Sequence, residues 1–210
     1  MAELIRGIDG RVVAANVERV RERAGPAVEL LAATKYVPLE EMGTLAEAGV
    51  SLVGENRLAD LEAKQGRWGD AFTWDFIGAV QSRKVRALLG LVRLIHSIAS
   101  DSALRKLEAH AEPGAEVLVE VNLSGEESKG GIAPQELGDF IARCPVRVSG
   151  LMTMPPLAAD PEASRPYFAR LAALAAEHEL ERLSMGTSQD WEVAVDEGAT
   201  IVRLGGALYR

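Results

Sequence analysis

Apolar segments that favour β-structure recur eight times along this chain, and a stretch with a helical pattern separates each from the next. Most of them are near-continuous apolar runs, as in central strands of a parallel sheet covered on both faces. The predicted strands are residues 28–34, 51–54, 73–78, 93–98, 116–122, 146–152, 182–186 and 200–205. The predicted helices between them are residues 39–48, 57–65, 82–89, 102–111, 134–143, 162–179 and 190–198.

Strict alternation of strand and helix predicts right-handed crossovers and a parallel sheet. Eight strands in 210 residues favour a closed (β/α)8 TIM barrel over an open sheet. An extra N-terminal helix at residues 11–23 should cap or flank the barrel. Pro38 and Pro134 lie where a first helical turn tolerates proline, and Asp101 is placed as an N-cap. No low-complexity linker interrupts the sequence, so we expect residues 1–210 to form a single domain.

Charge and composition narrow the class of protein. A net charge of −8 argues against a nucleic-acid partner, and no apolar run approaches the roughly 20 residues of a membrane span. The N-terminal segment has no secretion signal, and the single Cys144 excludes a disulfide within the chain, so we expect a cytoplasmic protein. The three histidines have no metal-ligand spacing, and no metal site is expected.

Residues able to carry chemistry follow the predicted strands. In α/β barrels the site lies at the carboxyl ends of the strands, on the loops that come next. The residues found there are Lys35, Glu55, Asn56, Gly78 to Gln81, Asn122, Met152, Gly186 to Ser188 and Arg203 to Gly206. Helical faces alone would not produce this convergence, so the pattern predicts one site at one end of the barrel.

Lys35 comes directly after the apolar run Leu30-Leu31-Ala32-Ala33. An ammonium at a strand end of low dielectric loses hydration, which favours its neutral, nucleophilic form. Such amines form Schiff bases with aldehydes, pyridoxal 5'-phosphate above all. Position alone leaves a solvated loop lysine as the alternative.

The last two loops have the composition of a phosphate site. Thr187 and Ser188 supply hydroxyls before a predicted helix, while Gly205 and Gly206 let the backbone approach a ligand closely. Helix capping by the hydroxyls and a tight turn at the glycines are the alternatives for each loop. Both loops together, in the place where barrels bind phosphate, favour a phosphate site.

Three further residues keep two interpretations each. Arg203 shares a strand side with Ile201 and, if that side faces the interior, could meet the pyridine nitrogen of pyridoxal phosphate or a carboxylate such as Glu120. Asn56 could bind a ligand oxygen or cap the next helix. Lys129, in the long polar loop from residue 122 to 131, could meet an aldehyde or phosphate or be solvated.

The order of these motifs along the chain resembles the pyridoxal phosphate homeostasis protein family, which is related to the barrel domain of alanine racemase. The matching segments are Ala33-Thr34-Lys35, Gly54-Glu55-Asn56-Arg57, Phe76-Ile77-Gly78 with Gln81, Ser82 and Lys84, His96-Ser97-Ile98, the stretch from Val121 to Lys129, Gly150-Leu151-Met152, Leu183-Ser184-Met185-Gly186 and Val202-Arg203-Leu204-Gly205. The resemblance implies a TIM barrel of pyridoxal phosphate fold type III. It assigns the Schiff base to Lys35, the phosphate to Ser188, Gly205 and Gly206, the pyridine nitrogen to Arg203, and the sides of the ring to Asn56 and Met152.

The resemblance implies a monomeric carrier, not an enzyme, that holds the cofactor for pyridoxal phosphate homeostasis and delivers it to apo-enzymes. The alternative is a pyridoxal phosphate-dependent amino-acid racemase, which needs a second acid/base group. Alanine racemase-like proteins take that group from an additional β-domain, which we expect to be absent because the chain ends at Arg210, soon after the last predicted strand. A barrel enzyme acting on a phosphorylated metabolite would leave Lys35 unexplained.

Five positions depart from the pattern of that family. Where it usually has His, Pro, Asn, Asp and Thr, this chain has Asp75, Ala79, Arg83, Ala99 and Gly206. The loop after the third strand is therefore expected to differ in shape. At Gly206 a hydroxyl is lost, which would leave phosphate binding there to backbone amides.

Overall fold

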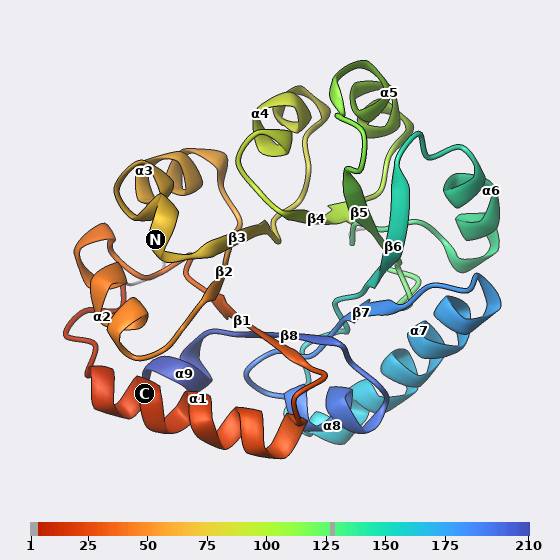
Figure 1. Cartoon of the computed structure of the whole chain (residues 1–210). Helices are drawn as coiled ribbons and strands as arrows, with labels where there is room; N and C mark the ends of the chain where they lie inside the picture. Colours follow the sequence, from red (N-terminus) through yellow and green to blue (C-terminus); the bar gives the residue numbers. More distant parts are fainter. Residues whose placement is uncertain (1–3, 127–128) are drawn as a thin grey trace.

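Eight parallel strands close into a barrel in the computed structural model, which describes residues 4–126 and 129–210 (Figure 1). The strands are β1 (Glu29–Ala33), β2 (Leu52–Glu55), β3 (Thr73–Phe76), β4 (Leu94–Ile98), β5 (Glu116–Glu120), β6 (Arg147–Met152), β7 (Arg182–Ser184) and β8 (Ile201–Leu204). Each strand pairs with the next, and β8 closes the ring by pairing with β1, where Leu31 lies opposite Arg203. The predicted (β/α)8 TIM barrel is confirmed.

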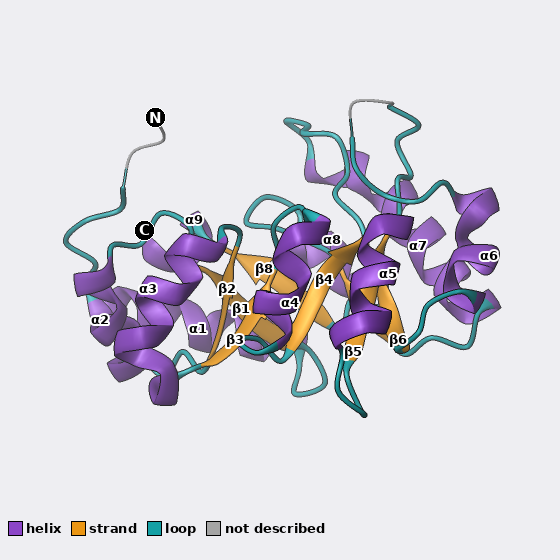
Figure 2. Cartoon of the chain, turned by 90° about the horizontal axis from the view of Figure 1, so that it is seen from above, coloured by secondary structure: helices purple, strands orange, loops and turns teal. Residues whose placement is uncertain are grey.

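Helices surround the barrel on its outside (Figures 1 and 2). They are α1 (Gly10–Ala24), α2 (Met42–Glu47), α3 (Leu58–Trp68), α4 (Val85–Leu89), α5 (Asp101–His110), α6 (Leu137–Ala142), α7 (Arg165–Glu177), α8 (Trp191–Asp196) and α9 (Gly206–Tyr209). Short 3-10 turns accompany them at Leu39–Glu41, Gly69–Ala71, Ser82–Lys84, Pro134–Glu136 and Pro161–Ser164.

Several boundaries of strands and helices differ from the prediction. The predicted strands 73–78 and 116–122 end at Phe76 and Glu120, because the chain leaves the ladder there to form the loops of the site. Asp101 is not the N-cap of α5 but its first residue, and the hydroxyl of Ser100 accepts from Ala103 N over 3.2 Å instead. Pro38 is extended and precedes a 3-10 turn rather than an α-helical one.

Helix α1 flanks the barrel and does not cap it. Its residues Val13, Val17 and Val20 recur at helical spacing and are buried against the barrel. The Asn16 amide donates to the backbone oxygens of Leu208 and Arg210, both over 3.2 Å, and so ties α1 to the end of the chain. Figure 1 shows α1 beside α9 and α2. The C-terminal turn that follows β8 is thereby held in place.

Two apolar layers support the site. The larger lies between the strands and the helices and includes fully buried Phe76, Phe140 and Phe168. The smaller fills the inside of the barrel with residues from alternating positions of several strands. Its buried members are Leu31, Leu52, Leu94, Leu118, Met152 and Ile201. Because Met152 also lines the main cavity, this inner layer forms the floor of the cavity.

Among the helices that the structure describes, none has both the length and the apolar character that crossing a membrane requires.

Candidate functional site

A cavity of about 600 Å³ opens at the carboxyl ends of the strands. This size is typical of sites for small molecules, which range from about 300 to 1,000 Å³. All seven residues that the sequence singled out for the ligand line it: Lys35, Asn56, Met152, Ser188, Arg203, Gly205 and Gly206. They come from five different strands or the loops after them, so closure of the barrel is what brings them together.

Lys35 lies two residues beyond the end of β1 and is exposed at the mouth of the cavity. Its Nζ lies 4.9 Å from the centroid of the Tyr36 ring, a cation–π contact. The predicted loss of hydration at a strand end is wrong for this side chain. The strand ends at Ala33, and the two further residues carry the amine past the apolar layer to the open rim.

A buried ion pair holds the chain beneath Lys35. Lys64 of α3 donates to Glu55 Oε1 over 2.5 Å and to the backbone oxygen of Thr34 over 2.7 Å. The Thr34 hydroxyl donates to the same Glu55 oxygen over 2.6 Å, so the ends of β1 and β2 are joined to one helix. The sequence analysis missed Lys64, although its position three residues after Leu61 on α3 places it on the buried face.

Ser188 and the last glycines form a polar cradle at one end of the cavity. Ser188 Oγ accepts hydrogen bonds from Gly205 N and Ala207 N, both over 3.1 Å. Gly206 N has no acceptor among the residues that the structure describes. A Cβ added at Gly206 would meet no atom within 4 Å, so this position borders open space. Hydroxyl and amide groups therefore surround a space that an anion can enter.

Helix capping, the alternative for the hydroxyls of this loop, is not observed, because α8 (Trp191–Asp196) has no side-chain cap hydrogen bond. Asp190 is the N-cap of α8, and its Oδ1 accepts from Thr187 N over 2.7 Å and from the Thr187 hydroxyl over 3.0 Å. Thr187 is thus engaged by the loop itself. Ser188 is directed instead toward the turn after β8.

Asn56 has a buried side-chain oxygen, Oδ1, that lacks a hydrogen-bond partner among the described residues. It is not the cap of α3, because Arg57 is at that position and its helix has no side-chain cap. Gly78 packs directly against it: a Cβ there would lie 2.2 Å from the backbone oxygen of Asn56. The loop after β3 can approach Asn56 this closely only because residue 78 is glycine.

Arg203 points into the barrel and is only 5% exposed. Its Nη1 donates to Ser184 Oγ over 2.6 Å, and its Nη2 donates to the Thr153 backbone oxygen over 3.0 Å and to Met154 Sδ over 2.8 Å. These bonds use only part of the N–H donors of a guanidinium, and the side chain also lines the cavity. Arg203 can therefore donate to a ligand.

Glu120, the alternative partner of Arg203, lines the same cavity but forms no ion pair with it among the described residues. Burial lowers the pKa of Arg203 to about 10, although the charges of Glu120 and Asp190 oppose the shift. Burial likewise raises the pKa of Glu120, and the charge of Arg203 opposes it. The two groups are coupled through space without a direct bond.

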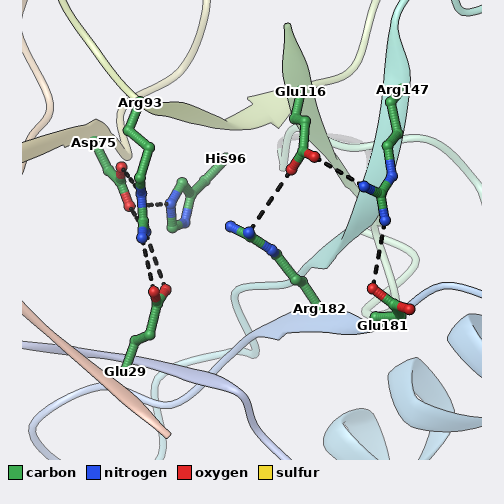
Figure 3. A network of polar contacts seen from close by, with 8 residues as sticks. All are labelled: Glu29, Asp75, Arg93, His96, Glu116, Arg147, Glu181 and Arg182. Atoms are coloured by element: carbon green, nitrogen blue, oxygen red, sulfur yellow. Dashed lines mark hydrogen bonds and ion pairs between the residues drawn. The ribbon is translucent and has the colours of Figure 1, made fainter. Parts of the chain in front are cut away.

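Behind Arg203, polar side chains continue through the barrel toward its other end. Ser184 Oγ lies 2.9 Å from His96 Nδ1, and His96 Nε2 lies 3.1 Å from Asp75 Oδ2. Arg93 donates to Asp75 over 2.7 and 3.0 Å and to Glu29 over 2.7 and 3.0 Å. Figure 3 shows the polar contacts that link His96, Asp75, Arg93 and Glu29. Next to them is a separate ion network formed by Glu116, Arg147, Glu181 and Arg182.

Burial alone would raise the pKa of Asp75, but the hydrogen bonds from His96 and Arg93 outweigh it and hold that pKa below its ordinary value. Asp75 is one of the positions that depart from the family pattern, and its place here explains an acidic residue inside the barrel: it pairs with a cation and a histidine. Sequence analysis missed this role, because nothing along the chain links Asp75 to His96.

Lys129 does not join the site in the described part of the chain. Its Nζ lies 3.3 Å from Glu126 Oε1, and it is not among the described residues that line the cavity. Glu127 and Ser128, in the middle of the predicted loop, lie outside the described residues. No group of three or more His, Cys, Asp or Glu side chains suited to a metal ion occurs within residues 4–126 and 129–210.

Comparison with protein-family models matches residues 8–210 to "Alanine racemase, N-terminal domain". A curated relative from Aquifex aeolicus, named pyridoxal phosphate homeostasis protein, is 40% identical, and the alignment covers 92% of this chain and 92% of the relative. The chain belongs to this family. The resemblance identified from the sequence is thereby confirmed.

Two further proteins are similar over most of their length. A pyridoxal phosphate homeostasis protein of Pseudomonas aeruginosa is 37% identical, covering 94% of this chain and 91% of that relative. The structure of PipY from Synechococcus elongatus, solved with PLP bound, has a TM-score of 0.83 and 29% sequence identity. That comparison covers 94% of this chain and 100% of PipY.

Proposed function

We propose that this protein binds pyridoxal 5'-phosphate through a covalent bond to Lys35 and serves intracellular pyridoxal phosphate homeostasis. The observation that carries the proposal is that one cavity contains an accessible lysine, a hydroxyl-and-amide cradle and a buried arginine. Relatives across the whole chain are named for pyridoxal phosphate homeostasis, and PipY was solved with PLP bound.

The residues present fit this cofactor. Ser188 Oγ and the amides of Gly205 and Gly206 would hold the phosphate, and the open space at Gly206 leaves room for it. Arg203, which lines the cavity, would donate to the pyridine nitrogen. Asn56 Oδ1 is a buried acceptor that lacks a partner among the described residues, so a donor on a ligand would satisfy it.

The chemistry of the bound group is that of an aldehyde, which the Lys35 amine can attack to form a C=N bond with loss of water. Met152 would support the ring from the floor of the cavity. An arginine facing the pyridine nitrogen keeps that atom unprotonated, because a guanidinium only donates. The ring is then a weak acceptor of electrons, which suits holding the cofactor better than carbanion chemistry.

The finer assignments belong to the same proposal. We infer a single-domain, monomeric, cytoplasmic carrier, not an enzyme, that delivers the cofactor to apo-enzymes. The names of the relatives, which specify homeostasis, support this role. The alternative is an amino-acid racemase, and measuring D- and L-alanine interconversion separates the two.

The test is a titration of the purified protein with pyridoxal phosphate. We expect a visible absorbance band that borohydride reduction abolishes, because hydride converts the C=N bond to a secondary amine and leaves the cofactor attached to Lys35. Lys35→Ala should abolish the band, whereas Lys106→Ala, which removes an exposed lysine of α5, should leave it unchanged. Lys129→Ala should also keep it, because that amine pairs with Glu126 away from the cavity.

Two outcomes would contradict the proposal. A wild-type protein that develops no band with excess cofactor does not bind it at Lys35. Racemisation of alanine by the loaded protein, lost in Lys35→Ala, would establish the racemase in place of the carrier.

A further inference from the structure

Ser184, His96 and Asp75 form a hydrogen-bonded chain that ends at the guanidinium of Arg203, and none of the three lines the cavity. All three side chains come from different strands and are completely buried. Buried polar groups lower stability unless they are hydrogen-bonded. Three of them in series inside the barrel therefore call for a functional explanation. This hydrogen-bonded series reaches the cavity at Arg203.

Only one arrangement of protons satisfies every link and also gives the Ser184 hydroxyl proton an acceptor among the described residues. Arginine can only donate, so Ser184 Oγ accepts from Arg203 Nη1. The Ser184 hydroxyl proton then goes to His96 Nδ1, which must be the unprotonated ring nitrogen. His96 Nε2 therefore carries the ring proton and donates it to Asp75 Oδ2. The imidazole is neutral, and hydrogen bonds hold it on both sides.

We propose that Ser184, His96 and Asp75 are positioning residues for Arg203, which hold its guanidinium in one orientation so that its remaining N–H donors face the cavity. The inference rests on the proposed function, which assigns Arg203 to the pyridine nitrogen. Arg93 completes the chain by holding Asp75 from the other side.

A second proton on His96 would disrupt the arrangement. Nδ1–H would then donate to Ser184 Oγ, which already accepts from Arg203, and the serine proton would have no acceptor among the described residues. Burial lowers the pKa of His96; its bond to Asp75 opposes this, and the charges of Arg203 and Arg93 lower the pKa further. At neutral pH the hydrogen-bonded series Ser184–His96–Asp75 therefore has one protonation state, and Ser184 presents the same acceptor to Arg203 throughout.

Ser149 of β6 provides a matched comparison. Like Ser184 it is a buried strand serine, 3% exposed, but its Oγ has no hydrogen-bond partner among the described residues. Replacing either serine by alanine deletes one oxygen from the core. Only at Ser184 does the deletion separate Arg203 from His96.

The first measurement needs neither cofactor nor variant. The protein has three histidines, so 15N-histidine labelling gives a simple long-range 1H–15N spectrum. We expect His96 to appear as the neutral Nε2–H tautomer at pH 7 and above. A His96 whose Nδ1 carries a proton at pH 7 overturns the inference.

The second measurement adds pyridoxal phosphate. Loading the cavity engages Arg203, so the His96 Nδ1 signal should shift in the wild type. Ser184→Ala should weaken cofactor binding about ten-fold, the equivalent of one hydrogen bond to a charged group, and abolish that shift at saturation. Ser149→Ala should change neither quantity, and Ser184→Thr, which keeps the hydroxyl, should restore both.

A purely structural role for Ser184 would lower stability in Ser184→Ala without removing the response of His96, and that result overturns the inference. If Ser184→Ala does not fold, the wild type is sufficient for the test. A wild-type His96 signal that does not change at saturating cofactor also overturns the inference. Absence of the visible band in the wild type identifies failure of the proposed function instead, since the tautomer in the free protein is measured independently.

Discussion

Single residues set the chemistry of the cavity. The sequence indicated which residues belong to the site, but not how exposed they are or which groups they contact. The position of Lys35 after an apolar run predicted a lysine at the mouth of the barrel, but not that the side chain would be exposed. Asn56 kept two interpretations in the sequence, and ligand binding is favoured only by its buried Oδ1, which lacks a hydrogen-bond partner among the described residues. Neighbours far along the chain determine exposure and pairing, and no local pattern encodes them.

Gly206 allows a prediction at this scale. A Cβ there would meet no atom within 4 Å, so a side chain fits without strain. Gly206→Ser should therefore add a hydroxyl beside the proposed phosphate position and tighten pyridoxal phosphate binding by about three- to ten-fold, in the range of one charge-assisted hydrogen bond. Titration of the visible band measures this. Gly206→Ala, which adds only the Cβ, should bind like the wild type; equal affinity of both variants would contradict the prediction.

At the scale of elements, the eight strands were predictable because a buried parallel strand leaves an apolar run in the sequence. The residues at which these strands end were harder to predict. Strand β3 stops at Phe76 and β5 at Glu120, where tertiary contacts draw the chain into the site loops. Helix α9 was missed because its four residues are too few for a periodic pattern. Lys64 on α3 was not singled out in the sequence, although it is a buried partner of Glu55.

The link between α3, β1 and β2 should be sensitive to Lys64. Lys64→Met leaves the Glu55 carboxylate buried without its cation, so the free energy of unfolding should fall by about 3–5 kcal/mol. Urea unfolding measures this loss. Lys106→Met, which changes an exposed lysine on α5, should stay within about 0.5 kcal/mol of the wild type.

A double variant, Lys64→Met with Glu55→Gln, removes the buried charge as well and should recover most of the lost stability. If the double variant is no more stable than Lys64→Met alone, packing of the lysine stem, and not the charge pair, accounts for the loss.

For the whole molecule, the buried chain through the barrel couples stability to pH. Burial lowers the pKa of His96 below its ordinary 6.5, and its bond to Asp75 only partly opposes this. Between 6.5 and the native value, the unfolded chain binds a proton that the native state does not. Stability should therefore fall as the pH falls below about 6.5, by up to about 1.4 kcal/mol per pH unit. Asp75, whose native pKa is also lowered, should extend the loss below its ordinary value of 3.8.

Urea unfolding at several pH values, compared between the wild type and His96→Gln, isolates this contribution. Glu120 acts in the opposite direction, because burial raises its native pKa, but it is present in both proteins and cancels in the difference. The variant should lose less stability between about pH 7 and 5. Parallel curves would show that His96 does not bind the linked proton.

The sequence by itself determined the barrel, the strand ends that carry the site and seven of the residues that line the cavity, because apolar runs are local and parallel strands end on one face. Only the tertiary structure decided which interior polar groups meet. The links Asp75–His96, His96–Ser184 and Ser184–Arg203 join residues 21, 88 and 19 positions apart. Alternation along a strand tells which way a side chain points, but the partner across a closed barrel depends on the register of every strand between them.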